Sequence, residues 1–249
     1  MMKISLITVT YNSAATFQDT INSVNAQNHP DIEYIVVDGA SKDNTLNIIK
    51  ANENKISKWI SEPDKGIYDA MNKGLKLVTG EVIGIINSDD FYYNDTIISS
   101  VAKAFEDENV DAVFGDLVFV DPDNLDKVVR TYSSKNWYPE KFARGFMPAH
   151  PTFFVRRKYY EQFGLFKTDY KIAADYELLI RFLYVNKLRY KYLPLTMVTM
   201  RKGGVSSNGI KSNIILNEEI IRGCRENGIK TNVFKVYSKY FFKVFELMN

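Results

Sequence analysis

The four residues from Asn87 to Asp90 read Asn-Ser-Asp-Asp and directly follow an apolar run, Val82 to Ile86. Such an unbroken run is typical of a strand covered on both faces, as in a parallel sheet. Two adjacent carboxylates at its end are costly to bury as charges unless something compensates them. Because no cluster of His or Cys accompanies them, we expect Asp89 and Asp90 to hold Mg²⁺ or Mn²⁺ rather than zinc, with a nucleotide diphosphate completing the oxygen shell and Asn87 nearby.

Two further acids stand where ligands are bound in open α/β sheets. Asp38 ends the apolar segment Tyr34 to Val37, and a carboxylate there can accept the imide N–H of uracil or guanine. The alternative is a solvated loop acid or a helix cap, which is our interpretation of Asp43. Asp64 precedes a predicted helix N-terminus, which favours anionic ligands, but it also fits a capping residue.

A possible proton acceptor lies in the second half of the chain. Asp175 begins an apolar helical pattern in Ala-Ala-Asp-Tyr-Glu, and a carboxylate there could take a proton from a substrate hydroxyl. A first-turn acid stabilised by the helix dipole is the simpler reading, and Glu177 competes for the same role. His150 lies in an aromatic loop, where a pocket role and a structural role are equally compatible with the sequence.

The first half of the chain alternates strand and helix patterns. We predict strands at 3–9, 33–38, 58–61, 81–86 and 111–115, and helices at 16–27, 44–51, 66–78 and 95–105. Asn72 shares a face of the third helix with Asp69. This alternation predicts an α/β fold with a Rossmann-like, mostly parallel central sheet flanked by helices.

The second half loses this rhythm. We predict strands at 128–132 and 152–155, a pocket-lining loop at 136–151, a helix at 174–185, a turn at 201–206, and helices at 211–226 and 232–247. We therefore expect one domain over 1–206, with a nucleotide-binding half of about 1–116 and an acceptor half of about 117–206. Residues 207–249 would form a C-terminal helical extension.

Composition narrows the function further. The 249 residues carry a net charge of only +2, so no nucleic-acid partner is indicated. A single cysteine, Cys224, excludes an internal disulfide, and neither a signal peptide nor an apolar run of roughly 18 residues is present. We expect a cytoplasmic protein.

The last predicted helix carries a basic stripe, Lys235, Lys239 and Lys243, among aromatic residues. A basic, aromatic amphipathic helix can lie in an anionic membrane surface. It can equally pack on the domain with its lysines in solvent. Peripheral contact with the inner face of the cell membrane therefore remains one of two readings.

Four segments in order resemble the family 2 glycosyltransferases of GT-A fold, particularly small bacterial enzymes that build surface polysaccharides. The segments are Ile4–Asn12, Val36–Thr45, Ser61–Gly74 and Gly80–Asp90, and the resemblance covers roughly residues 3 to 206. One position departs from the family pattern, because the first acid of its Asp-x-Asp motif is Asn87 here. Fewer carboxylates would then hold the metal.

The resemblance implies a role for each matched residue. Asp38 would contact the base, Asp64 the base and ribose, and Asp89 the ribose and diphosphate, while Asp90 would hold the metal. Asp175 corresponds to the family's general base. The remaining implied contacts are with the nucleotide, through Thr8, Tyr11 and Asn72, and with the donor or acceptor pocket, through Asn87, His150 and Glu177.

These roles imply an inverting glycosyltransferase. It would use a nucleotide-sugar donor, with UDP-sugars favoured, a divalent metal, and a hydroxyl of a glycan or lipid-linked acceptor. One alternative is a sugar-1-phosphate nucleotidyltransferase, although Thr10 to Ala14 stands where such enzymes carry a Gly-rich basic loop. A non-catalytic binding protein that kept the fold is the other alternative.

Overall fold

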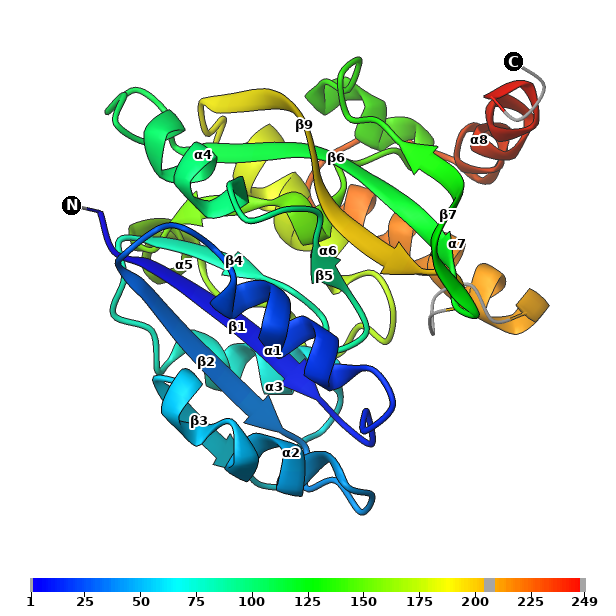
Figure 1. Ribbon diagram of the computed structural model, residues 1–249. Coiled ribbons are helices and arrows are strands. Elements are labelled where there is room, and N and C mark those ends of the chain that lie inside the picture. Colours follow the sequence, from blue (N-terminus) through cyan, green and yellow to red (C-terminus); the bar gives the residue numbers. More distant parts are fainter. Residues whose placement is uncertain (1, 204–208, 247–249) are drawn as a thin grey trace.

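The computed structural model describes residues 2–203 and 209–246. Within them nine strands form one mixed sheet with helices on both faces (Figure 1). The strands are β1 (Ile4–Thr10), β2 (Ile32–Asp38), β3 (Lys58–Ser61), β4 (Val82–Ile85), β5 (Phe91–Tyr92), β6 (Ala112–Asp121), β7 (Asn124–Tyr132), β8 (Phe154–Arg156) and β9 (Tyr190–Arg201). The α-helices are α1 (Phe17–Asn25), α2 (Thr45–Ala51), α3 (Ile67–Leu75), α4 (Ile97–Ala104), α5 (Lys158–Phe163), α6 (Ala174–Leu179), α7 (Gly209–Glu226) and α8 (Val233–Glu246).

The N-terminal part of the sheet is parallel, as predicted. Strands β3, β2, β1 and β4 lie in that order, and all of their pairings are parallel. Consecutive parallel strands need crossover helices, which α1, α2 and α3 supply. Their carboxyl ends therefore gather the loops that carry Tyr11, Asp38, Asp64 and Asp89 at one edge, which we call the strand-end rim.

Beyond β4 the sheet becomes mixed. Strand β8 is antiparallel to both β4 and β6, β7 forms a hairpin with β6, and β5 is antiparallel to β9. Only the β6–β9 pairing is parallel in this part of the described sheet. The predicted parallel arrangement is thus confirmed for β3-β2-β1-β4, whereas most pairings in the rest of the described sheet are antiparallel.

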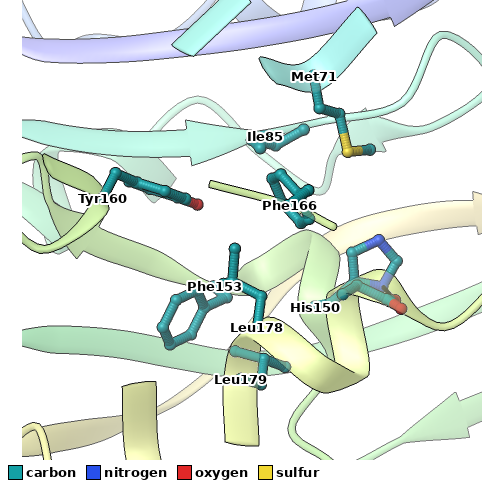
Figure 2. A pocket seen from close by; sticks show the side chains of 9 residues that line it. Met71, Ile85, His150, Phe153, Tyr160, Phe166, Leu178 and Leu179 are labelled. Atoms are coloured by element: carbon teal, nitrogen blue, oxygen red, sulfur yellow. Dashed lines mark ion pairs between the residues drawn. The ribbon is translucent and has the colours of Figure 1, made fainter. Parts of the chain in front are cut away.

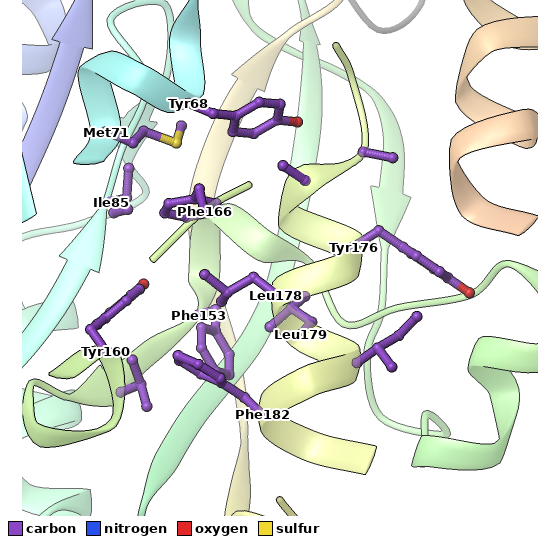
Figure 3. Packing of buried hydrophobic residues seen from close by; sticks show 14 of the residues in the cluster. Tyr68, Met71, Ile85, Phe153, Tyr160, Phe166, Tyr176, Leu178, Leu179 and Phe182 are labelled. Atoms are coloured by element: carbon purple, nitrogen blue, oxygen red, sulfur yellow. The ribbon is translucent and has the colours of Figure 1, made fainter. Parts of the chain in front are cut away.

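The two faces of the sheet carry separate cores because side chains alternate along each strand. Ile4 and Leu6 pack with α1, α2 and α4 on one face. Ile7 and Val9 pack with α3, α6, α7 and α8 on the other. Figure 3 shows that second core around α6, with Leu178 and Phe182 gathered near Tyr160 and with Tyr176 pointing to the opposite side.

Several short or irregular elements were not predicted. Strand β9 contains Pro194 and only weak alternation, and helix α5 has six residues, too few to show a helical period. The predicted loop 136–151 contains the 3₁₀ turn Pro139–Arg144 and the start of another, His150–Thr152, while Glu53–Lys55 is also 3₁₀. The predicted helix 174–185 continues from α6 as a π-helical turn, Ile180–Val185. Part of the predicted turn at 201–206, and residue 247, lie outside the described residues.

No helix in the ranges 2–203 and 209–246 combines the length and apolar character that a bilayer crossing requires.

Candidate functional site

One end of the rim is formed by the loops after β1, β2 and β3, which carry the residues predicted to contact the base. Asp64 lies so close to Gly39 that a β-carbon on the glycine would sit 2.3 Å from the carboxylate oxygen Oδ2. The same added carbon would lie 3.4 Å from the ring of Tyr11, which is exposed. Three sequence-predicted residues, Tyr11, Asp38 and Asp64, are therefore brought to one place by the absence of a side chain at Gly39.

The carboxylate of Asp38 is fully buried at the end of β2. It accepts hydrogen bonds from the backbone N–H and hydroxyl of Ser41 and from the hydroxyl of Ser61, the latter at 2.6 Å. Asp38 thus ties the loops that follow β2 and β3 together. A base would have to contact an oxygen that already has partners, or replace one of the two serines.

The backbone of this region adopts left-handed conformations at residues that have side chains. Asn12 has φ 50° and Ala40 has φ 60°. The Oδ1 atom of Asn12 accepts a hydrogen bond from the N–H of Lys42 at 2.8 Å, which locks the β1 and β2 loops together. Such conformations cost free energy and are over-represented at ligand sites.

The acidic tetrad places its two carboxylates differently. The Asp90 side chain is fully buried, its Oδ2 accepts a hydrogen bond from the Asn87 amide at 3.0 Å, and its Oδ1 has no partner. Burial, and then the neighbouring charge of Asp89, raise the pKa of Asp90 well above its usual range. Asp89 is partly exposed, and its backbone carbonyl accepts a hydrogen bond from Arg201 at 2.6 Å.

This donor set fits a divalent cation. The unpartnered Oδ1 of Asp90, next to a second carboxylate, is an oxygen that a cation would satisfy. Among the described residues no three or more His, Cys, Asp or Glu side chains gather as a metal site. Further oxygen ligands would come from diphosphate and water. Asp89 is the accessible carboxylate and Asp90 the inner one, whereas the sequence favoured Asp90 as the metal holder.

Asp175 lies at the wall of a pocket between the end of β4 and helix α6. Its Oδ2 lies 3.1 Å from Nδ1 of His150, and its Oδ1 accepts hydrogen bonds from the Tyr176 N–H at 2.8 Å and the Tyr68 hydroxyl at 3.4 Å. Figure 2 shows Met71, Ile85 and Phe166 on one side of the pocket and Phe153, Leu178 and Leu179 on the other. Burial, and then the negative charge of Asp175, raise the pKa of Tyr68 well above its usual range.

Three predicted site residues have side chains that are used inside the fold. Thr8 is fully buried and accepts a hydrogen bond from Tyr34 at 3.1 Å. Asn72 donates to the carbonyl and accepts from the N–H of Phe166. Glu177 is completely buried between Lys167 and Arg181, at 3.0 Å from each. The side chains of these three residues are thus engaged inside the fold, and the nucleotide or pocket contacts expected for them stay predictions.

Sequence reasoning missed several residues that shape the site. Tyr68 contacts Asp175 across 107 positions, and Arg201 bonds the carbonyl of Asp89 across 112. The hydroxyls of Ser13 and Ser88 meet at 2.8 Å and join the β1 loop to the tetrad. Tyr68 and Ser88 had a signal, since they stand within the segments Ser61–Gly74 and Gly80–Asp90 that carry the family resemblance. Arg201 ends a strand that was not predicted.

Two relatives that sequence comparison finds for this chain are both described as glycosyltransferases. A "PGL/p-HBAD biosynthesis glycosyltransferase" of Mycobacterium bovis is 28% identical over 217 residues, which covers 83% of this chain and 79% of the relative. An uncharacterized glycosyltransferase of Mycobacterium tuberculosis is 29% identical over 181 residues, or 72% of this chain and 68% of the relative.

Solved structures share the fold. S. aureus TarS residues 1–349 in complex with UDP-GlcNAc align with a TM-score of 0.72 and 21% identity, over 92% of this chain and 68% of that one. The chain spans only 41% of the longer TarS structure. The mannosyltransferase PcManGT from Pyrobaculum calidifontis, in complex with GDP-Man and Mn²⁺, aligns with a TM-score of 0.65 and 22% identity, over 89% of this chain and 64% of that one.

The family model described as glycosyl transferase family 2 matches residues 5–164, which span the strand-end rim and the loop that carries His150. The chain belongs to glycosyl transferase family 2.

Proposed function

We propose that this protein transfers a sugar from a nucleotide-sugar donor to a hydroxyl of a glycan or lipid-linked acceptor in surface polysaccharide biosynthesis. The complexes of TarS with UDP-GlcNAc and of PcManGT with GDP-Man and Mn²⁺ support a nucleotide-sugar donor and a divalent metal. Family membership argues against the nucleotidyltransferase alternative. Asp38 and Asp64 suit a base with an imide N–H, which uracil and guanine both carry. Of these two we favour a UDP-sugar because the TarS complex with UDP-GlcNAc aligns with the higher TM-score.

One observation carries the proposal. The carboxylate of Asp175 is held by His150 in an apolar pocket, and the wall of that pocket includes Ile85, two residues before the acidic tetrad. Asp175 therefore shares its pocket with the last residue of β4, the strand that leads directly into the acidic, cation-suited turn. Inverting glycosyl transfer needs these two functions on opposite sides of one sugar carbon.

The residues suggest the following chemistry. Asp175 accepts the proton of the acceptor hydroxyl while the hydroxyl oxygen attacks the anomeric carbon from the face opposite the diphosphate. The new C–O bond forms as the bond to the diphosphate breaks, which inverts the carbon. A divalent cation bound at Asp89 and Asp90 would neutralise the charge that develops on the leaving diphosphate. The apolar walls around Asp175 exclude water that would otherwise compete with the acceptor.

The donor is tested by thermal unfolding with UDP or GDP, each with and without Mn²⁺. The base is tested by Asp175→Asn, with Asp126→Asn on the exposed strand β7 as the matched control. We expect Asp175→Asn to bind UDP as the wild type does and to lose transfer by about 10²–10⁴-fold. Near-full transfer by this variant would refute the base assignment.

The acceptor's lipid character is proposed from helix α8. Of the expected basic stripe, Lys235 is exposed, Lys239 is only 4% exposed, and the side chain of Lys243 lies outside the described part. The outward face instead presents Val233, Phe234 and Tyr237, and Phe234 is 87% exposed. With Lys235 also exposed, this face suits peripheral contact with an anionic membrane.

Vesicle flotation tests that contact. The wild type should float with vesicles containing phosphatidylglycerol, and Phe234→Asp should not, while both unfold at the same temperature. Equal flotation of the two proteins would remove α8 from the proposal and leave the donor chemistry untouched.

A further inference from the structure

The loop from Lys167 to Ala173 leads into helix α6 and so determines where Asp175 lies. Glu219 of helix α7 accepts hydrogen bonds from three consecutive backbone N–H groups of this loop, those of Lys171 at 2.7 Å, Ile172 at 2.9 Å and Ala173 at 2.9 Å. The Glu219 side chain is 9% exposed. A buried carboxylate that collects three amides forms charge-assisted bonds, which hold a loop more firmly than neutral ones.

Further residues on the same face of α7 also contact the loop. Arg222, Gly223 and Glu226 stand three, four and seven positions after Glu219, which places all four residues on one side of the helix. The Arg222 guanidinium lies 4.2 Å above the ring of Tyr170. A β-carbon on Gly223 would lie 3.6 Å from the Tyr170 hydroxyl, an ordinary contact distance, so this part of α7 faces Tyr170 directly.

Glu226 completes this contact. Its carboxylate accepts hydrogen bonds from the Tyr170 hydroxyl at 2.9 Å and from the Lys167 ammonium at 2.8 Å. Burial alone would raise the pKa of Glu226, but its bonds with Lys167, Arg222 and Tyr170 lower it to about 2. Glu226 is therefore charged at neutral pH and binds both ends of the segment Lys167–Tyr170.

The loop is held from the opposite side by helix α3. The Tyr68 hydroxyl donates to the carbonyl of Ile172 and also reaches Asp175 at 3.4 Å. The N–H of Ile172 is bound by Glu219. The peptide groups before Asp175 are thus fixed between one helix from the first half of the chain and one from the C-terminal region.

We propose that helix α7, which lies beyond the region matched by the family model, is a working part of the active site, with Glu219 as the positioning residue for Asp175. The proposal rests on the proposed function of Asp175 as the proton acceptor. Misplacing a reacting group by about 1 Å can cost on the order of 10²-fold in rate. Loss of the three amide bonds releases the loop, and kcat falls while donor binding at the strand-end rim persists.

The test compares Glu219→Gln with Glu218→Gln, its exposed neighbour on α7. Hydrogen exchange reports on the amides of residues 171–173, calorimetry on UDP binding with Mn²⁺, and steady-state kinetics on kcat and donor KM. We expect Glu219→Gln to exchange these amides faster and to lose about tenfold or more in kcat. Its UDP affinity and donor KM stay within about twofold, and Glu218→Gln behaves as the wild type.

Two results would overturn the proposal. One is unchanged exchange at 171–173 in Glu219→Gln, and the other is faster exchange with unchanged kcat. The isosteric Gln keeps the helix surface intact where Glu219→Ala could unfold it. A wild-type protein that transfers no sugar, although its 171–173 amides are protected, would count against the proposed function instead, because the hydrogen-exchange comparison does not depend on turnover.

Discussion

The Nδ1 atom of His150 lies 3.1 Å from the Oδ2 atom of Asp175. His150 is also the more accessible partner, with 28% of its side chain exposed against 12% for Asp175. The contact joins the turn that follows the aromatic loop to the first turn of α6. A carboxylate that a ring N–H holds in one orientation is pre-organised to accept a proton.

The first prediction removes that ring N–H. His150→Phe keeps the ring volume but leaves Asp175 without its partner on Oδ2, so kcat should fall about tenfold or more. The donor KM should change little, because Tyr11, Asp38 and Asp64, which we predict to bind the nucleotide, belong to other loops. Steady-state kinetics with varied donor measures both constants.

The chain offers a matched control for this variant. His29 is the only other histidine, and it is bonded to the backbone carbonyl of Met2, at the opposite end of the parallel strands. His29→Gln should leave kcat unchanged. If His150→Phe kept a kcat within about twofold of the wild type, the contact would have no catalytic role.

The second prediction concerns the metal. Donor and Mn²⁺ at about 100 times their dissociation constants should stabilise the wild type by about 2.7 kcal/mol, or roughly 5–10 °C in Tm. Asp89→Asn should lose the Mn²⁺-dependent part of this shift, because it removes the accessible carboxylate. Asp95→Asn, on the exposed loop that follows, is the control. The measurement is the Tm of each protein with UDP, with and without Mn²⁺. If Mn²⁺ raised the Tm of Asp89→Asn as much as that of the wild type, the ion would bind elsewhere.

Strands β1, β2 and β4 could be predicted because they are covered on both faces and read as continuous apolar runs. The strand predicted at 3–9 is observed at Ile4–Thr10, and the one predicted at 81–86 at Val82–Ile85. Strand β9 could not, because its N-terminal half is partly exposed and contains Pro194. Its place beside β6 depends on pairing with a strand about 80 positions away, which no local pattern records.

The residues of the candidate site also include some that the sequence could predict and others that it could not. Acids that follow strands were visible, since the topology alone brings strand ends together. The spacing alone did not distinguish Asp175 from Glu177, and only the family resemblance favoured Asp175. Two positions in a helix rotate the side chain by about 200°. The structure turns Asp175 to the pocket and Glu177 to Lys167 and Arg181. The bond between Glu219 and Ile172 spans 47 positions and had no sequence signal.

The third prediction uses the missing side chain at Gly39. In Gly39→Ala the new β-carbon would lie 2.3 Å from Oδ2 of Asp64, so that carboxylate must move. The backbone at Gly39 does not require a positive φ, and Asp64 is partly exposed, so the fold should tolerate the change. UDP affinity should fall about tenfold, the equivalent of one charged hydrogen bond of about 1.5 kcal/mol.

A double-mutant cycle with Asp64→Asn separates the proposed cause from others. If Gly39→Ala acts by displacing Asp64, it should have little further effect on UDP affinity in the Asp64→Asn background. Calorimetry with UDP gives all four affinities. Full additivity of the two losses would mean that Gly39→Ala disturbs the rim by some other route.

The fourth prediction concerns acid stability and Glu33 of strand β2. Burial alone would raise the pKa of Glu33, but hydrogen bonds from Ser5, Thr79 and Lys58 lower it from 4.5 to about 2. Because the pKa of Glu33 is lower in the folded state than in the unfolded state, ionised Glu33 stabilises the fold. This stabilisation is present above about pH 4.5 and is lost as the pH falls towards 2. A shift of this size corresponds to on the order of 3 kcal/mol.

Glu33→Gln should therefore cost stability at neutral pH and flatten the loss of stability between pH 4.5 and 2. The Ser5 hydroxyl and the Thr79 N–H both donate to Oε2 of Glu33 at 2.6 Å, whereas the Thr79 hydroxyl and the Lys58 ammonium donate to Oε1. The NH₂ group of glutamine cannot accept, so Glu33→Gln leaves one of these two pairs of donors without an acceptor. Urea unfolding at pH 7 and at several values down to pH 2.5 measures the difference, with the exposed Glu81→Gln as control. If the free energy of unfolding fell with pH in parallel for Glu33→Gln and the wild type, the acid sensitivity would arise from other carboxylates. Asp111 would be the first to examine, because hydrogen bonds with Arg189 and Tyr159 lower its pKa to about 2 against the effect of burial.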